Sequence, residues 1–230
     1  MGDMSNMVQQ LSAETTPEII YPDSDGQPMA DNTKQYQWIV KVKENLEILF
    51  ASNPDVFIAG DLLWYPVEGN PKIRQAPDVL VVFGRPKGDR GSYQQWKENN
   101  IPPQVVFEIL SPGNRTSAMI NKSLFYQRYG VEEYYIYDPD SIELSGFVRY
   151  QDAFVVIEDI NGWISPRLGI RFQLVSDNLE IYYPDGNKFL TSVEFDQLAK
   201  QERQEKEAAI QQYQELLTKL QEKGIDLGTR

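Results

Sequence analysis

The chain has 230 residues, of which 41% are hydrophobic, 12% aromatic and 24% charged, the composition of a globular protein rather than a disordered or membrane-embedded one. It contains no cysteine and no histidine, which excludes disulfides, zinc clusters, thiol nucleophiles and every catalytic triad or metal site that needs an imidazole. Any catalysis must rest on carboxylate, Lys, Tyr, Ser or Thr side chains with a hard metal held by oxygen ligands, and the net charge of −12 argues against strong non-specific binding to nucleic acid.

Residues 1–30 are polar and rich in turn-forming residues, and we interpret them as an N-terminal arm lying on the domain. The first ten residues have neither the basic region nor the apolar core of a secretory signal. The chain also lacks an uninterrupted apolar run of about 18 residues, the length that a membrane span needs. We therefore expect a cytoplasmic protein that does not enter a membrane.

The segment 31–190 has the pattern of a single domain built from helices and strands. Apolar residues recur at helical spacing from Asn32 or Thr33 until Pro54 ends the pattern. A polar loop of about 20 residues, 84–103, is long enough to favour a functional or mobile loop. Short apolar runs before and after this loop predict three strands: 56–59, 78–83 and 105–110.

Residues 111–114 break the third strand and can cap a helix from about Arg115 to Tyr129, which Gly130 would close. The aromatic run 134–137 predicts a further buried strand. Four alternating segments then predict antiparallel hairpins that extend the sheet: 146–150, 154–157, 170–174 and 179–182.

The segment 191–230 is rich in Glu, Gln, Lys and Arg, and we interpret it as a C-terminal helical tail. This helix is expected to be either packed or dimerising. Four of its apolar residues have the 3-4-3 spacing of a short coiled coil: Ile210, Tyr213, Leu217 and Leu220.

Basic residues are concentrated between positions 70 and 130. Nine basic and four acidic side chains give this block a charge of +5, against −17 for the rest of the chain. Such a block could form a local positive cleft for a polyanion. The alternative is that these side chains are spread over separate, solvated surfaces.

Two carboxylates stand out against the predicted strands. Asp78 follows Pro77 at the start of one strand, and Glu108 lies within an apolar strand, where a charge is costly unless it is paired or binds a metal. A divalent cation is the natural way to satisfy two carboxylates that are brought together. Lys122, in the next helix, could orient an attacking water or stabilise charge that builds on a phosphate.

These residues occur in a pattern that resembles the Uma2 family, a largely bacterial group, abundant in cyanobacteria, with the restriction-endonuclease-like PD-(D/E)XK fold. The resemblance covers roughly residues 30–190. It implies an α/β fold with a mixed central sheet flanked by helices, a β-hairpin extension and a C-terminal helix. Four motifs carry it: Pro77-Asp78; Glu108-Ile-Leu-Ser-Pro112; Lys122 with Tyr126; and Gly130-Val-Glu-Glu-Tyr-Tyr-Ile-Tyr-Asp-Pro139.

The resemblance further implies a metal-dependent phosphodiesterase site. Asp78 and Glu108 would hold Mg²⁺ or Mn²⁺, and the backbone carbonyl of Ile109 would add a ligand. The nuclease motif has a lysine two residues after the glutamate, where this chain has Leu110. The resemblance therefore assigns the catalytic lysine role to Lys122.

Other positions are matched more loosely. Asp25-Gly26 corresponds to an acidic N-terminal element of the family, and Asn32 or Gln35 stands where other members have a histidine. Three arginines are candidates for phosphate contacts: Arg74, Arg115 and Arg128.

Each candidate has a simpler interpretation. Asp78 could be a turn residue at a strand start, Glu108 could form a salt bridge with Lys122 or an arginine, and Lys122 could be an exposed helical lysine. Asp61 could be a further metal ligand, although a role as a turn or capping residue is favoured. Asp138 is interpreted as a turn residue. Four aromatic residues could stack on bases, but we expect them to pack beneath the long loop: Trp64, Tyr65, Tyr93 and Trp96.

The favoured hypothesis is a Mg²⁺-dependent endonuclease acting on DNA as a homodimer, because cleavage of both strands needs two sites. The alternative is a catalytically inactive nuclease-fold protein that binds nucleic acid or protein. A geometric test separates the two hypotheses. The endonuclease needs the carboxylates of Asp78 and Glu108 within about 4–5 Å of each other, close enough to share a divalent ion, with the Lys122 ammonium nearby. Side chains on opposite faces of the sheet would exclude it.

Overall fold

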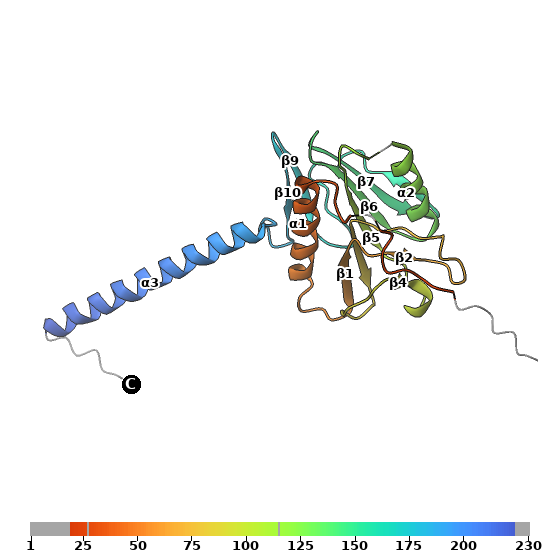
Figure 1. Ribbon diagram of the computed structural model, residues 1–230. Coiled ribbons are helices and arrows are strands. Elements are labelled where there is room, and N and C mark those ends of the chain that lie inside the picture. The colour runs from red at the N-terminus through yellow and green to blue at the C-terminus, as the bar shows by residue number, and fades with distance from the viewer. Residues whose placement is uncertain (1–18, 27, 115, 224–230) are drawn as a thin grey trace, which may run out of the picture.

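The computed structural model describes residues 19–26, 28–114 and 116–223 (Figure 1). A six-stranded mixed sheet forms the centre of an α/β domain, with strand order β1-β3-β5-β6-β7-β8. These strands have the following bounds: β1 (Val56–Gly60), β3 (Val79–Phe83), β5 (Val105–Ile109), β6 (Glu133–Asp138), β7 (Glu143–Tyr150) and β8 (Ala153–Val156).

The helices are α1 (Thr33–Leu49), α2 (Thr116–Arg128) and α3 (Ser192–Glu222). The side-chain oxygen of Asn32 accepts a hydrogen bond from the backbone N–H of Gln35 and caps the start of α1. Strands β5 and β6 are parallel, and α2 provides the crossover between them, while the other neighbouring pairs are antiparallel. The predicted helices and central strands are confirmed to within a few residues.

The two faces of the sheet are covered by different helices, which explains the continuous apolar runs in the central strands. Val79 and Val81 of β3 pack with Trp38 and Val42 of α1 on one face. Leu80 and Val82 point the other way and pack with Tyr126 of α2. We call these the α1 face and the α2 face. Alternation along each strand thus assigns every inward side chain to one of two cores.

Two small sheets complete the domain. Strands β9 (Arg171–Val175) and β10 (Asn178–Tyr182) form an antiparallel hairpin, and β2 (Trp64–Tyr65) pairs in parallel with β4 (Tyr93–Gln94). The β7–β8 hairpin extends the central sheet as expected, but the β9–β10 hairpin does not. It forms a separate sheet, because Phe172 packs into the core of the α1 face instead of adding a ladder at the sheet edge.

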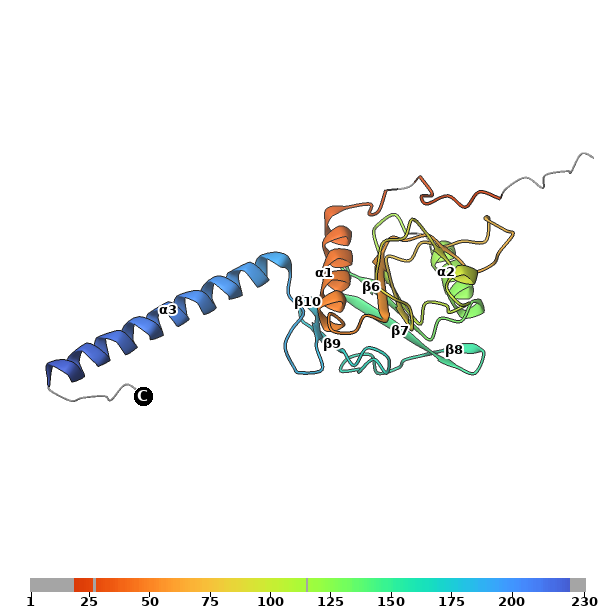
Figure 2. The ribbon, with the colours of Figure 1, turned by 90° about the horizontal axis from the view of Figure 1, so that it is seen from below.

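The helix α3 leaves the domain near α1 and the β9–β10 hairpin and extends away from both, as the two views show (Figures 1 and 2). Within the ranges given above, no helix combines the length and the apolar character that are needed to cross a membrane.

Candidate metal and active centre

Asp78 and Glu108 lie on the same face of the sheet. The antiparallel register pairs Val79 of β3 with Phe107 of β5, so its continuation by one residue places Asp78 opposite Glu108. Directly opposed residues in an antiparallel pair point to the same side. Here that side is the α2 face, because Glu108 contacts two residues of α2. The same-face condition set by the sequence is therefore met.

Glu108 is almost completely buried, and both of its carboxylate oxygens accept hydrogen bonds from α2. Lys122 Nζ donates to Oε2 at 2.7 Å, and the Tyr126 hydroxyl donates to Oε1 at 2.5 Å. Lys122 and Tyr126 are four residues apart, so one face of the helix presents both donors. Sequence reasoning noted Tyr126 only as part of a motif, although this spacing places it beside Lys122.

Asp78 is also buried, but its carboxylate accepts fewer hydrogen bonds than the carboxylate of Glu108 does. Its Oδ2 accepts a hydrogen bond from the backbone N–H of Ile109 at 2.6 Å. No residue that the structure describes donates to Oδ1. Burial first, and then the nearby charge of Glu108, raise the pKa of the Asp78 carboxyl to about 8. Asp78 is thus an acid whose charge the protein alone does not stabilise.

The ammonium group of Lys122 keeps its charge in this setting. Burial alone would lower the pKa of Lys122, but the carboxylates of Glu108 and Asp78 outweigh burial and raise it. The side chain of Lys122 is 20% exposed, against 3% for Glu108, so the cation lies nearer to solvent than the carboxylate it pairs with. The geometry is that of a cation placed between a buried acid and the surface.

Asp61 is a third acid close to this centre. Its backbone N–H donates to the Asp78 carbonyl at 3.2 Å, which continues the β1–β3 pairing beyond Gly60. Its backbone has a φ of 48°, a left-handed conformation that Asp tolerates better than most residues. Burial first, and then the charge of Asp25, raise the pKa of Asp61. Asp61 therefore ends a strand, as interpreted, and also faces the acidic centre.

The backbone carbonyl of Ile109 accepts a hydrogen bond from a side chain of α1, a contact that the sequence did not predict. Gln35 of α1 is buried, and its Nε2 donates to the Ile109 carbonyl oxygen at 2.8 Å. Its Oε1 accepts from the backbone N–H of Asp31 at 2.8 Å, which fixes the orientation of the amide. Of the two candidate positions at the start of α1, Asn32 caps the helix and Gln35 reaches β5. Gln35 and Ile109 are 74 positions apart, and no local pattern indicates their contact.

The donor set suits a hydrated hard cation. Among the residues described, no three carboxylates are gathered so as to enclose a metal ion. Mg²⁺ needs no such cage, because it keeps several water molecules and is commonly bound by one or two carboxylates together with substrate phosphates. Asp78 Oδ1 accepts no hydrogen bond from the described residues, so it is the oxygen best placed to accept a cation. Asp78 and Glu108 therefore fit such an ion.

A buried hydroxyl on β6 is a further feature of the α2 face. Tyr134 is fully buried, and its hydroxyl has no hydrogen-bond partner among the described residues. Burial first, and then the charges of Glu108 and Asp78, raise its pKa. Its ring lies 5.0 Å from that of Tyr126, edge to face. The sequence predicted a buried strand here, but not the proximity of this hydroxyl to the acids.

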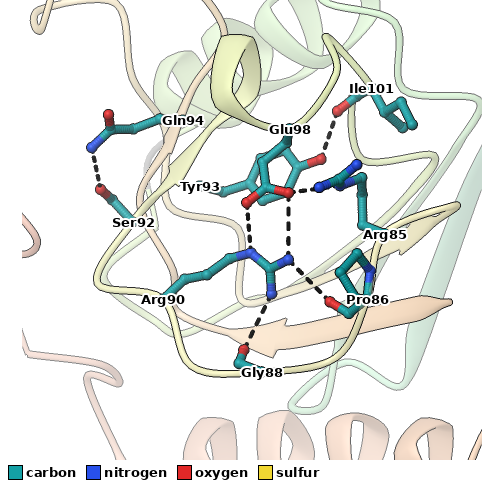
Figure 3. Close-up of polar contacts among 9 residues, drawn as sticks. All are labelled: Arg85, Pro86, Gly88, Arg90, Ser92, Tyr93, Gln94, Glu98 and Ile101. Carbon is teal, nitrogen blue, oxygen red and sulfur yellow. Dashed lines mark hydrogen bonds and ion pairs between the residues drawn. The ribbon is translucent and has the colours of Figure 1, made fainter. Parts of the chain in front are cut away.

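Half of the described basic side chains between residues 70 and 130 are paired with carboxylates. Glu98 accepts from Arg85 at 2.6 Å and from Arg90 at 2.8 Å, so one carboxylate binds both guanidinium groups (Figure 3). Lys87 pairs with Glu47 at 2.7 Å. Four basic side chains of the block have no carboxylate partner within the described ranges: Lys72, Arg74, Lys97 and Arg128. Arg115 lies outside the described residues.

The long loop 84–103 is held by backbone hydrogen bonds to the domain and by contacts of its own. The Lys87 N–H donates to the Pro54 carbonyl at 3.0 Å and the Tyr93 N–H to the Leu63 carbonyl at 2.8 Å. Arg90 also donates to the carbonyl oxygens of Pro86 and Gly88, and the Tyr93 hydroxyl donates to the Ile101 carbonyl (Figure 3).

Trp64, Tyr65 and Tyr93 are completely buried, so none of them is available to stack on bases. The ring of Trp64 packs against Tyr126 of α2 and that of Tyr65 against Tyr21, not beneath the loop alone. The half-buried Trp96 packs against Tyr21 of the arm, with ring centroids 4.8 Å apart.

Comparison with known proteins identifies the family of this chain. The model of the family described as "Uma2: Putative restriction endonuclease" matches residues 10–176. A crystal structure described as that of "a putative nuclease belonging to DUF820" from Anabaena variabilis ATCC 29413 is similar, with 17% identity and a TM-score of 0.44 over 61% of this chain and 74% of that one. No curated protein matches the sequence. Since the family model covers more than half of the chain, this protein belongs to the Uma2 family of restriction-endonuclease-like proteins.

Proposed function

We propose that the chain is a cytoplasmic, metal-dependent endonuclease that hydrolyses phosphodiester bonds in DNA. The activity is assigned to residues 31–190, with residues 1–30 as an arm and residues 191–230 as a helical tail. The observation that carries this proposal is the opposed pair Asp78 and Glu108 on the α2 face, with the Lys122 ammonium 2.7 Å from Glu108. Two buried acids beside one cation are costly to fold and have an evident use in phosphate chemistry.

Asp78 and Glu108 would hold Mg²⁺ or Mn²⁺ in this proposal. The Ile109 carbonyl is the third candidate oxygen; it already accepts one hydrogen bond from Gln35 and has a second lone pair. When bound, the ion would supply Lewis-acid polarisation of the scissile phosphate.

The remaining steps depend on side chains of the chain itself. Lys122 stays charged, so its ammonium can donate to a phosphate oxygen or to the attacking water. Tyr126 fixes the orientation of Glu108 by donating to Oε1. Arg74 and Arg128, which have no carboxylate partner in the described part of the chain, are available for phosphate contacts. We further propose that two copies act together on duplex DNA.

One observation favours a second candidate function. Both oxygens of Glu108 already accept hydrogen bonds from α2, and four of the eight described basic side chains of the block are paired within the protein. A nuclease fold that keeps these contacts permanently would be catalytically inactive and would serve as a module that binds nucleic acid or protein. The two candidates differ in whether the centre takes up a divalent ion.

Calorimetric titration with Mg²⁺ and Mn²⁺ at low salt distinguishes them. We expect saturable binding that Asp78→Asn and Glu108→Gln each abolish. Asp138→Asn is the matched control, because Asp138 Oδ1 accepts from the backbone N–H of Asp140 in a turn at the end of β6, as its sequence position suggested. Cleavage of plasmid DNA should fall by about 100-fold or more in both site variants. Lys122→Met should reduce cleavage while metal binding remains.

The opposite result is equally specific. If neither ion binds with or without DNA, while the chain still binds DNA or a protein, the binding module becomes the better description. If the ions bind but Asp138→Asn weakens binding as much as Asp78→Asn does, the metal lies elsewhere.

A further inference from the structure

The C-terminal helix carries an apolar stripe that the domain does not cover. α3 has 31 residues, and only its first turns contact the body of the protein, where Phe195 and Leu198 line an 800 Å³ cavity together with Ile48. Beyond this root the helix extends away from every other described element (Figures 1 and 2). Ile210 is 48% exposed and Tyr213 is 62% exposed. Most helical stability in proteins comes from packing of an apolar face, so a partner that covers this stripe would stabilise the segment.

The charges around the stripe indicate what kind of partner fits. In a heptad frame with Ile210 at position a, the flanking positions within the stripe are uncharged: Ala209, Gln214, Leu216 and Gln221. Two identical helices can therefore approach along this stripe without meeting like charges, even though each chain carries a net charge of −12. The stripe is compatible with its own copy.

The residues that precede the stripe select the direction of pairing. In the same frame, Arg203 and Lys206 occupy core positions. In a parallel pair each would face its own copy across the core, and Glu202 would flank Glu207 of the other helix. All three contacts join like charges, so charge repulsion between the helices disfavours the parallel arrangement.

An antiparallel pair removes these conflicts. With the crossing point between Ile210 and Tyr213, the aliphatic stems of Lys206 and Arg203 face the apolar side chains of Leu217 and Leu220 of the other copy. Glu202 then flanks Lys223 of the other copy, a contact between opposite charges. Glu202 and Lys223 are both exposed and accessible for such a contact.

We propose that α3 forms an antiparallel coiled-coil dimer with the α3 of a second copy, centred between Ile210 and Tyr213. About 20 residues separate this centre from the root of each helix, so the two domains lie roughly 60 Å apart at opposite ends of the pair. Because the paired stripe is short, it buries less area than a standard interface of about 1,600 Å². The dissociation constant of the dimer therefore lies in the micromolar range. The two domains, at opposite ends of the helix pair, do not contact each other.

Sedimentation equilibrium of the full chain across the micromolar range tests the association. The wild type should shift from monomer to dimer with concentration, and Leu217→Glu should raise the dissociation constant at least tenfold. Thr218→Glu is the matched control, since it adds the same charge one residue later, where the Thr218 hydroxyl donates to the Gln214 carbonyl of its own helix. A wild type that stays monomeric overturns the proposal, as does a Thr218→Glu variant that dissociates equally.

Disulfide trapping tests the direction, because the chain has no cysteine of its own. Under mild oxidation, Leu220→Cys alone and Arg203→Cys alone should remain uncross-linked, while a mixture of the two should give a covalent dimer. A self-cross-linked Leu220→Cys dimer would instead mean a parallel pair and would overturn the antiparallel arrangement. Neither experiment depends on nuclease activity, so failure here would remove the dimer from the proposed function but would leave the assignment of the metal centre to Asp78, Glu108 and Lys122 untouched.

Discussion

Glu108 and Glu133 lie on adjacent parallel strands and are equally buried, at 2% exposure each, yet their surroundings differ in kind. Glu108 points to the α2 face, where its partners are a cation and a hydroxyl and where Asp78 stands opposite. Glu133 points to the α1 face, as its pairing with Val105 shows. It accepts from the Tyr135 hydroxyl at 2.8 Å, from the Ser165 hydroxyl, and from the Arg167 backbone N–H at 2.6 Å.

This difference distinguishes Glu133, a carboxylate with a structural role, from Glu108, the carboxylate proposed to act in catalysis. Glu133 receives only neutral donors, which hold the segment around Ser165 and Arg167 against the sheet, and the Arg167 guanidinium pairs with Glu132 instead. Glu108 receives a partly exposed cation and shares its surroundings with a second acid. A set of neutral donors anchors a loop, whereas a cation beside two acids leaves charge that a ligand can still satisfy.

The first prediction concerns Glu133, which holds the segment around Ser165 and Arg167 against the sheet. Glu133→Ala removes the acceptor of three buried donors, and we expect it to lower the free energy of unfolding by about 3 kcal/mol. Glu133→Gln should recover part of the loss, since an amide oxygen can still accept one of these hydrogen bonds. Urea denaturation provides the measurement. Mg²⁺ affinity should remain within twofold of the wild type in Glu133→Gln, and a loss like that of Glu108→Gln would contradict the distinction between the two carboxylates.

The second prediction uses the charge of Asp78. Because the pKa of this acid in the folded protein, about 8, is above the ordinary value of 3.8, the folded state binds its proton more tightly than the unfolded state does. Stability in metal-free buffer must therefore fall as the pH rises from about 4 to about 8. Asp78→Asn keeps an oxygen to accept from the Ile109 N–H and carries no charge. We expect it to be more stable than the wild type by about 2 kcal/mol at pH 8.5 in EDTA.

The comparison at low pH is the internal control for this prediction. Near pH 4 the advantage of Asp78→Asn should vanish, because both forms are then neutral at this position. Burial also raises the pKa of Glu133, so the Asn variant should retain a smaller decline of the same sign. Thermal unfolding across this pH range measures both effects. An Asp78→Asn variant that is less stable than the wild type at pH 8.5 would mean that the charge of Asp78 is compensated in the fold.

Much of the fold could be predicted from local patterns. The apolar runs of β1, β3 and β5 are bounded by Pro, Gly and Asp residues, and their continuity reflects a sheet covered on both faces. Glu108 stood out for a related reason, since it interrupts an apolar strand with a charge, whereas Asp78 stood out as an acid after a proline at the start of a strand. The partnership of β9 with β10 alone was not predicted, because alternation indicates a hairpin but not the sheet to which it belongs.

The distinction between the two glutamates could not be predicted from the sequence. Glu133 begins an aromatic strand, much as Glu108 lies within an apolar one. What separates them are contacts with residues 14 to 34 positions away, such as Lys122 with Glu108 and Arg167 with Glu133. Such pairings follow from how the helix and the loop pack on the sheet, which no local spacing encodes.

The last prediction compares two buried tyrosines that differ in one hydrogen bond. Tyr126 and Tyr134 are both fully buried on the α2 face with their rings in contact, but only the Tyr126 hydroxyl has a partner within the described residues. Tyr126→Phe removes a donor from Glu108, and we expect a loss of about 1 kcal/mol in stability together with about tenfold weaker Mg²⁺ binding. Tyr134→Phe removes an unpaired hydroxyl from the same core and should leave both quantities nearly unchanged. Urea denaturation and calorimetry on the two variants measure the contrast. Equal losses in both would show that Tyr126 contributes through packing alone and does not orient the carboxylate.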